Sequence, residues 1–203
     1  KRISVLSVPI DCVTMDEAVQ RILQLTEESG LHLVATANAE MVMLANENPT
    51  LHTILNNASL VVPDGAGILW AAERQGEHVP ERVTGVDVTK RLFKVAAERQ
   101  IPVYCLGAAP GVAQRAIDNL SAQVGPLNIA GIHDGFFDST EEQEIVKAIG
   151  ESKAKLVFVA LGVPKQEQWI SEKLSHLDGI VAIGIGGSFD VLAGNIPRAP
   201  EWM

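Results

Sequence analysis

The sequence has no long hydrophobic run: within its 203 residues, no apolar stretch approaches the roughly 20 residues of a membrane-spanning helix. No signal peptide is recognisable at its start. Cysteine is also scarce, because Cys12 and Cys105 are the only two and neither has the spacing of a metal or redox motif. Cys105 lies in an apolar segment, so we expect a reduced core thiol in a cytoplasmic protein.

Basic residues are few, and the formal net charge is −9. Nucleic-acid-binding proteins present a clustered basic face, so no nucleic-acid partner is expected. The five histidines are scattered without the spacing of metal ligands, and there is no Asp-x-Asp pair to hold a metal beside a diphosphate. We therefore expect no metal and no other cofactor.

Several familiar motifs are missing as well. There is no Walker loop and no Gly-x-Ser-x-Gly sequence. Residues 184–188, Gly-Ile-Gly-Gly-Ser, lack the third glycine of the dinucleotide-binding fingerprint. These absences disfavour, but leave open, an NAD-dependent Rossmann-type oxidoreductase or epimerase. A non-catalytic nucleotide-binding regulator is the other alternative.

Apolar runs that stop at a glycine and precede a helix-like pattern recur along the chain. In the clearest case the run stops at Gly162, and Pro164 suits the first position of the helix that follows. Such a continuous run is typical of a strand buried on both faces of a parallel sheet. The sequence therefore predicts one α/β domain, a Rossmann-like, mostly parallel sheet flanked by helices, with two lobes at about 1–84 and 85–203.

Five of the expected strands deliver small or polar residues to one edge of this sheet. The segments that follow these strands begin at Ala35, Pro63, Gly107, Gly162 and Gly184. Ligands of open α/β sheets bind at the carboxyl ends of the strands, and the free N–H groups of a first helical turn attract anions. We therefore expect a site for a phosphorylated ligand at this edge.

Local signals predict several element boundaries. Thr14 and Glu17 form a capping box at the start of a helix. Further helices are expected over 49–57, 87–100 and 140–151, the last preceded by the caps Asp138 and Ser139. The alternating apolar residues of 3–10 predict an edge strand, and the polar segment 75–85 predicts a loop between the two lobes.

Asp64 is the best candidate for a catalytic group. It follows a buried strand and Pro63, and it precedes Gly65, so its carboxylate is expected at the sheet edge with backbone nearby. A carboxylate there can take a proton from an attacking hydroxyl. The alternative interpretation is a helix N-cap for the segment that contains Ile68.

Other polar residues at the same edge could bind substrate. Thr36 and Asn38 point the same way if the strand continues, which suits sugar hydroxyls or an acetamido group, although either could simply cap a helix. Arg82 could grip a phosphate or be an ordinary surface arginine. Gln166 lies in the first turn of an expected helix. A phosphate or ribose would bind there, or the turn is simply exposed to solvent. Asp134-Gly135 could meet a ribose or base, or form a plain turn.

Seven ordered motifs of this sequence resemble the WecG/TagA/CpsF family of bacterial glycosyltransferases, and its TagA branch most closely. The motifs are Thr36-Ala-Asn38, Pro63-Asp64-Gly65, Arg82-Val-Thr-Gly85-Val-Asp87, Leu106-Gly107, Gly162-Val-Pro-Lys-Gln-Glu167, Gly186-Gly-Ser-Phe-Asp190 and Arg198-Ala-Pro200.

The resemblance implies transfer of N-acetylmannosamine (ManNAc) from UDP-ManNAc to undecaprenyl-diphosphate-linked N-acetylglucosamine (GlcNAc), the start of wall teichoic acid. The donor is α-linked and the product β-linked, so it implies a single inverting displacement. Asp64 would be the base. Residues expected around the sugar and the diphosphate are Thr36, Asn38, Arg82 and Gln166. Those expected to seat the UDP are Gly107, Ala108, Asp134, Gly135, Gly162, Gly186 and Asp190.

The resemblance also implies a peripheral location on the inner face of the cell membrane. Family members usually continue past the Arg-Ala-Pro motif with a tail of arginines and apolar residues, whereas this sequence ends at Met203. We expect the missing tail to supply the membrane contact. Apolar surface where that tail would dock could favour a homo-oligomer.

Overall fold

The computed structural model describes residues 1–198 and 200, so Ala199 of the Arg-Ala-Pro motif and the terminal Met203 lie outside the described residues. Its centre is a six-stranded parallel sheet in the order β4-β3-β8-β7-β5-β6. The strands are β3 (Leu31–Ala37), β4 (Leu60–Pro63), β5 (Val103–Gly107), β6 (Ile129–His133), β7 (Leu156–Ala160) and β8 (Ile180–Gly184). The predicted α/β class with a Rossmann-like sheet is confirmed.

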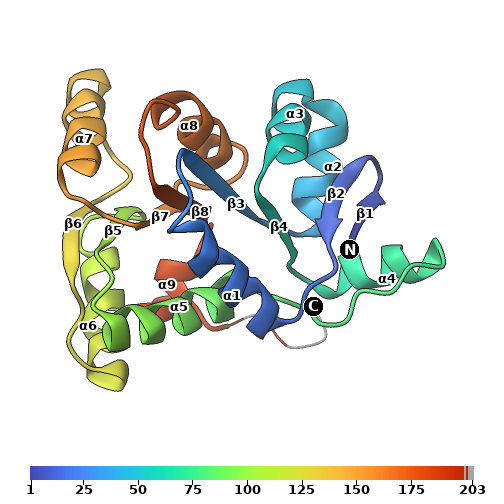
Figure 1. Cartoon of the computed structure of the whole chain (residues 1–203), viewed down its shortest axis with the longest axis horizontal. Helices are drawn as coiled ribbons and strands as arrows, with labels where there is room; N and C mark the ends of the chain where they lie inside the picture. The colour runs from blue at the N-terminus through green and yellow to red at the C-terminus, as the bar shows by residue number, and fades with distance from the viewer. Residues whose placement is uncertain (199, 201–203) are drawn as a thin grey trace.

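Helices cover both faces of this sheet, as Figure 1 shows. The helices that share a core with one face are α2 (Ala39–Glu47), α3 (Pro49–Asn57), α7 (Ser139–Glu151) and α8 (Lys165–Lys173). Those on the other face are α1 (Met15–Leu25), α5 (Gly85–Arg99), α6 (Val112–Val124) and α9 (Ser188–Leu192). Both faces of the strands are thus buried, which explains their continuous apolar runs.

The neighbouring strands β3 and β8 send the chain to opposite faces of the sheet. The helix after β3 is α2, on the first face, whereas the helix after β8 is α9, on the second. The two connections diverge, so a crevice opens outside the carboxyl ends of these strands, which is where ligands bind in open α/β sheets.

The N-terminal segment forms a two-stranded antiparallel hairpin, β1 (Arg2–Val5) and β2 (Val8–Asp11), so the prediction of a single edge strand over 3–10 is wrong. Leu6 and Ser7 turn the chain with φ of 46° and 69°, a left-handed conformation that residues of these types seldom adopt. The hairpin packs beside β4 and against α4 (Ala66–Arg74).

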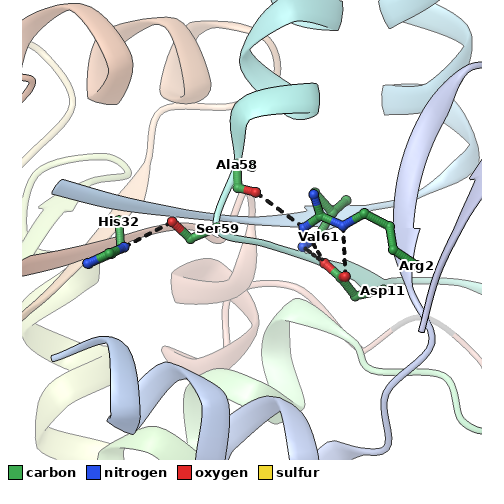
Figure 2. A network of polar contacts seen from close by, with 6 residues as sticks. All are labelled: Arg2, Asp11, His32, Ala58, Ser59 and Val61. Atoms are coloured by element: carbon green, nitrogen blue, oxygen red, sulfur yellow. Dashed lines mark hydrogen bonds and ion pairs between the residues drawn. The ribbon is translucent and has the colours of Figure 1, made fainter. Parts of the chain in front are cut away.

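Side chains fasten the hairpin to the sheet (Figure 2). Asp11 accepts two hydrogen bonds from the Arg2 guanidinium, each 2.8 Å, and one from the N–H of Val61 in β4, also 2.8 Å. Arg2 also donates to the carbonyl of Ala58 at 3.2 Å. The hairpin therefore covers part of the edge strand β4, which would otherwise leave backbone groups unpaired.

The predicted capping signals are present. Thr14 and Glu17 form both hydrogen bonds of a capping box, and Asp138 caps α7 in the same way with Glu141. Helix α5 begins at Gly85, two residues earlier than predicted, because Thr84 accepts from the N–H of Asp87. Helix α8 starts one residue after Pro164 rather than at it.

The predicted loop lies between α4 and α5, and the division into two lobes there stays a prediction. Cys105 is buried, which raises the pKa of its thiol and fits a core residue. In the part of the chain that the structure describes, no helix is long and apolar enough to cross a membrane.

Candidate active site

A cavity of about 450 Å³ lies at the carboxyl ends of β3, β4 and β8. Its polar side chains come from six different segments and include Thr36, Asn38, Asp64, Arg82, Thr84, Gln166, Ser188 and Arg198. Gly186 and Ile185 line it from the loop after β8, and Val163 from the loop after β7. The crevice expected from the sheet topology is therefore present as a cavity lined by polar side chains.

Asp64 directly follows the carboxyl end of β4, and backbone groups hold it there. Its N–H donates to the carbonyl of Ala37 at 2.8 Å, and its Oδ2 accepts from the N–H of Gly85 at 2.9 Å. The N-cap of α4 is Gly65, with no side-chain cap bond, so the interpretation of Asp64 as the cap of that helix is wrong. The carboxylate instead faces the first turn of α5 and the cavity.

The environment of Asp64 raises the pKa of its carboxyl group above the ordinary value. Burial is the largest cause, because a charged carboxylate is poorly solvated there. The Gly85 N–H and the positive charge of Arg82 oppose this effect and keep the charged form accessible. A carboxylate whose pKa moves toward working pH is a better proton acceptor than an exposed one.

Three side-chain oxygens meet over the first residue of α5. A Cβ atom on Gly85 would lie 3.3 Å from Ser188 Oγ and 3.4 Å from both Asp64 Oδ2 and Thr36 Oγ1. The Thr36 hydroxyl donates to the carbonyl of Gly184 at 2.9 Å, and the Ser188 hydroxyl to that of Ile185 at 2.6 Å. The absence of a side chain at position 85 lets this polar cluster form.

Asn38 and Gln166 line the cavity from the starts of two different helices, α2 and α8. Asn38 caps α2 by accepting from the N–H of Met41 at 2.9 Å, so the capping interpretation holds for this residue while its side chain also faces the cavity. Gln166 is buried, contrary to a solvated first turn, and its Oε1 accepts from the N–H of Gly186 at 3.1 Å.

Two arginines face this cavity, whereas the sequence pattern singled out only Arg82. Arg198 forms an ion pair with Asp87, which Thr84 also contacts through a 2.8 Å hydrogen bond. Thr84 and Arg198 were not predicted as site residues, although the Arg-Ala-Pro motif contained a signal for the second. The site thus holds cationic charge close to Asp64.

A second cavity of about 250 Å³ lies at the ends of β5 and β6 and is lined by Asp134, His133 and the start of α6. Ala108, with φ of 61°, links neighbouring loops: its N–H donates to Ala160 at 3.0 Å, and its carbonyl accepts from Gly135 at 2.8 Å. Asp134 makes a local turn by accepting from the N–H of Phe136.

Three more predicted residues lie near these cavities without lining them. Gly107 ends β5, where a Cβ would collide with the backbone of Ala160 at 2.3 Å. Gly162 accepts from the N–H of Gln166 at 2.8 Å, and Asp190 lies in α9. The structure thus brings Asp64, Thr36, Asn38, Arg82, Gln166 and Gly186 together at one cavity, and places Asp134 at the other. Their roles stay predictions.

Residues 1–198 and 200 contain no group of three or more His, Cys, Asp or Glu side chains placed to hold a metal ion.

Known proteins with related sequences match most of this chain. Residues 3–203 match the family described as "Glycosyl transferase WecG/TagA/CpsF family". Three curated relatives are named N-acetylglucosaminyldiphosphoundecaprenol N-acetyl-beta-D-mannosaminyltransferase. The Bacillus subtilis relative is 32% identical over 84% of this chain and 66% of its own length. The Bacillus spizizenii relative is 34% identical over 88% and 72%, and the Staphylococcus aureus relative 31% identical over 98% and 78%.

The chain thus spans between 66% and 78% of the length of these relatives. Among solved structures, a nicotinate phosphoribosyltransferase from Vibrio cholerae is 11% identical, with a TM-score of 0.24 over 92% of this chain and 49% of its own, too low to bear on function. The family match and the identities above 30% confirm the resemblance: the chain belongs to the WecG/TagA/CpsF family of glycosyltransferases.

Proposed function

We propose that this protein transfers ManNAc from UDP-ManNAc to undecaprenyl-diphosphate-linked GlcNAc, with inversion at the anomeric carbon. The observation that carries the proposal is the Asp64 carboxylate, held by the Gly85 N–H at the carboxyl ends of the strands and open to the 450 Å³ cavity. The names of the relatives supply the sugar and the acceptor. No comparison supports an NAD-dependent enzyme.

In the proposed reaction, an acceptor hydroxyl attacks the anomeric carbon of the donor as the bond from that carbon to the diphosphate breaks. The new glycosidic bond forms on the opposite face, so the α-linked donor gives a β-linked product. Asp64 takes the hydroxyl proton, and UDP departs with the bonding electrons. Holding both reactants in one cavity lowers the entropic part of the barrier.

Arg82 and Arg198 are suited to stabilise the departing diphosphate, since both line the same cavity. We therefore propose that the reaction needs no metal and continues in the presence of EDTA. Thr36, Asn38 and Gln166 would orient the sugar through hydroxyl and amide groups.

The second cavity offers a place for the nucleoside. β8 and β6 are separated by two strands, so their ends lie about 14 Å apart. That span suits an extended nucleoside diphosphate that runs from Gly186 past Gly162 and Gly107 to Asp134. We propose that UDP lies along this edge of the sheet.

The proposed acceptor is a lipid, so catalysis would occur at a membrane surface. We propose a peripheral location on the inner face of the cell membrane, where a nucleotide sugar and a lipid diphosphate meet. A homo-oligomer is compatible with this location, and co-sedimentation with vesicles and light scattering address the two points separately.

The test is a transfer assay with UDP-ManNAc and a short-chain prenyl-diphosphate GlcNAc, comparing the parent with Asp64→Asn. The variant keeps the size of the side chain and an acceptor for the Gly85 N–H. We expect turnover to fall by about a hundred- to ten-thousand-fold, the usual contribution of a general base, with little change in melting temperature. Asp118→Asn, an exposed change on α6, is the matched control.

Asp64→Asn turnover within a few-fold of the parent would remove Asp64 as the base. A parent that releases UDP equally from UDP-GlcNAc would refute the assignment of the sugar. Stabilisation by NAD rather than by UDP in a thermal-shift experiment would favour the oxidoreductase alternative, because a ligand stabilises the state that binds it.

A further inference from the structure

Glu167 is a fully buried carboxylic acid next to the cavity residue Gln166. Its exposed fraction is 0%, and that of Gln166 is 1%. Glu167 Oε2 is the one buried side-chain oxygen or nitrogen among the described residues that has no hydrogen-bond partner. Leaving a buried polar atom unpaired costs stability, so such an atom calls for an explanation.

The other carboxyl oxygen of Glu167, Oε1, accepts a hydrogen bond from the side chain of Gln166. Gln166 Nε2 donates to Glu167 Oε1 at 2.8 Å, while Gln166 Oε1 accepts from the N–H of Gly186 at 3.1 Å. The amide group of Gln166 is therefore held at both ends. An amide can flip and exchange its oxygen and nitrogen, and an acceptor placed at Glu167 Oε1 selects one of the two orientations.

The backbone of β8 packs directly onto this pair of side chains. A Cβ atom at Gly184 would lie 2.8 Å from both Gln166 Nε2 and Glu167 Oε1, so only glycine leaves room for them. From the other side, the Thr36 hydroxyl donates to the carbonyl of Gly184. The end of β8 and the loop with Gly186 are thus held between β3 and the first turn of α8.

We propose that Glu167 is a positioning residue for the donor: it orients the Gln166 amide, and through it the Gly186 N–H and the loop that would meet the donor diphosphate. This inference rests on the proposed function of the cavity. Glu167 does not line the cavity itself and acts only through Gln166. Burial raises the pKa of Glu167 to about 7, consistent with a side chain placed there for geometry rather than charge.

A pair of substitutions separates positioning from stability. Glu167→Met keeps a side chain of similar length and removes both oxygens, which should leave the melting temperature equal or higher. UDP should bind about five- to tenfold more weakly, the loss of about one hydrogen bond. Glu167→Gln restores an acceptor for Gln166 and should bind UDP within about threefold of the parent. Glu172→Gln, an exposed acid on the same helix, should change neither quantity.

Calorimetry with UDP measures the affinity, and thermal unfolding without ligand measures the melting temperature. Hydrogen exchange of the Gly186 amide in the ligand-free protein should be faster in Glu167→Met and near the parent rate in Glu167→Gln. This third measurement tests the effect of Glu167 on Gly186 without relying on UDP binding. If the parent binds no UDP, the proposed function fails, while exchange at Gly186 still decides the role of Glu167.

Unchanged UDP affinity or unchanged Gly186 exchange in Glu167→Met would overturn the inference. Failure of that variant to fold, or a lower melting temperature, would make Glu167 a structural residue and overturn it too. Loss of UDP binding in Glu167→Gln equal to that in Glu167→Met would show that the acceptor oxygen is not what matters.

Discussion

The Asp64 carboxylate balances two opposing influences. Burial favours its neutral form and raises its pKa, while the Gly85 N–H and the charge of Arg82 favour its ionised form. A general base must be ionised to accept a proton, yet a strongly stabilised carboxylate would be a weak base. The combination of burial with one hydrogen bond and a nearby arginine lies between these limits.

Replacing Arg82 should therefore move the pH dependence of the reaction. Arg82→Gln removes the positive charge that lowers the pKa of Asp64, so Asp64 should lose its proton only at higher pH. The acidic limb of the kcat/KM profile should shift to higher pH, in addition to any loss of donor affinity. Arg21→Gln, an exposed change on α1, should leave the limb in place. An acidic limb that is unchanged or moves to lower pH in Arg82→Gln would show that Asp64 is not the group that titrates.

Glu167 predicts a pH dependence of stability. Its pKa is about 7 in the folded chain and 4.5 in the reference state, so the folded chain keeps a proton that the unfolded chain releases. Stability is then greatest below about pH 4.5 and falls as pH rises to about 7, by on the order of 3 kcal/mol. Glu167→Gln should remove this part of the decline when melting temperature is followed against pH. Parallel curves for parent and variant would contradict the expectation.

At the scale of elements, the first turn of α5 has a direct role in shaping the site. Thr84 caps the helix, and Gly85 presents its N–H to Asp64. The same turn contains Asp87, which pairs with the cavity residue Arg198. One helix end therefore contacts the proposed base and, through Asp87, one of the two arginines.

Gly85→Ala tests this arrangement. The φ of Gly85 is not in the left-handed region, so alanine fits the backbone, but its Cβ would lie 3.3–3.4 Å from three side-chain oxygens. Asp64 would have to shift by a few tenths of an ångström. Turnover should fall by about tenfold while the melting temperature changes little, because small misplacements of catalytic groups are costly. Gly150→Ala in α7, whose Cβ would meet only Leu177, is the control. Full activity of Gly85→Ala would mean that the site tolerates the extra atom.

Local signals were readable in the sequence, whereas contacts between distant segments were not. The cap at Thr14 needs only residues three apart, and the position of Asp64 needs only a buried strand before it. The hairpin turn at Leu6 was missed because its residues are not typical of a left-handed turn. Arg198 reaches the cavity along a segment without regular structure, and Glu167 is buried only because β8 carries Gly184 opposite it. Such placements depend on packing that no local pattern encodes.

At the scale of the whole molecule, the N-terminal hairpin connects the edge of the sheet to the stability of the site. Asp11 accepts from Val61 in β4, three residues before Asp64. Unlike an exposed ion pair, this carboxylate is only 14% exposed and also satisfies a backbone N–H. Its loss should weaken the edge strand that carries the proposed base.

Asp11→Ala leaves the Val61 N–H without its acceptor and the Arg2 guanidinium without its partner (Figure 2). An unsatisfied, partly buried donor costs about 1–3 kcal/mol, so the melting temperature should fall by roughly 2–10 °C in a chain of this size.

The matched control is Glu28→Gln, which breaks the Arg21–Glu28 pair, whose side chains are 41% and 47% exposed. Exposed pairs contribute about 0–1 kcal/mol, so this change should be small. Well below the transition, Asp11→Ala should keep its turnover, because the hairpin does not reach the cavity. Equal effects of the two substitutions on the melting temperature would show that the hairpin is only loosely attached and that β4 is stabilised by its pairing with β3 alone.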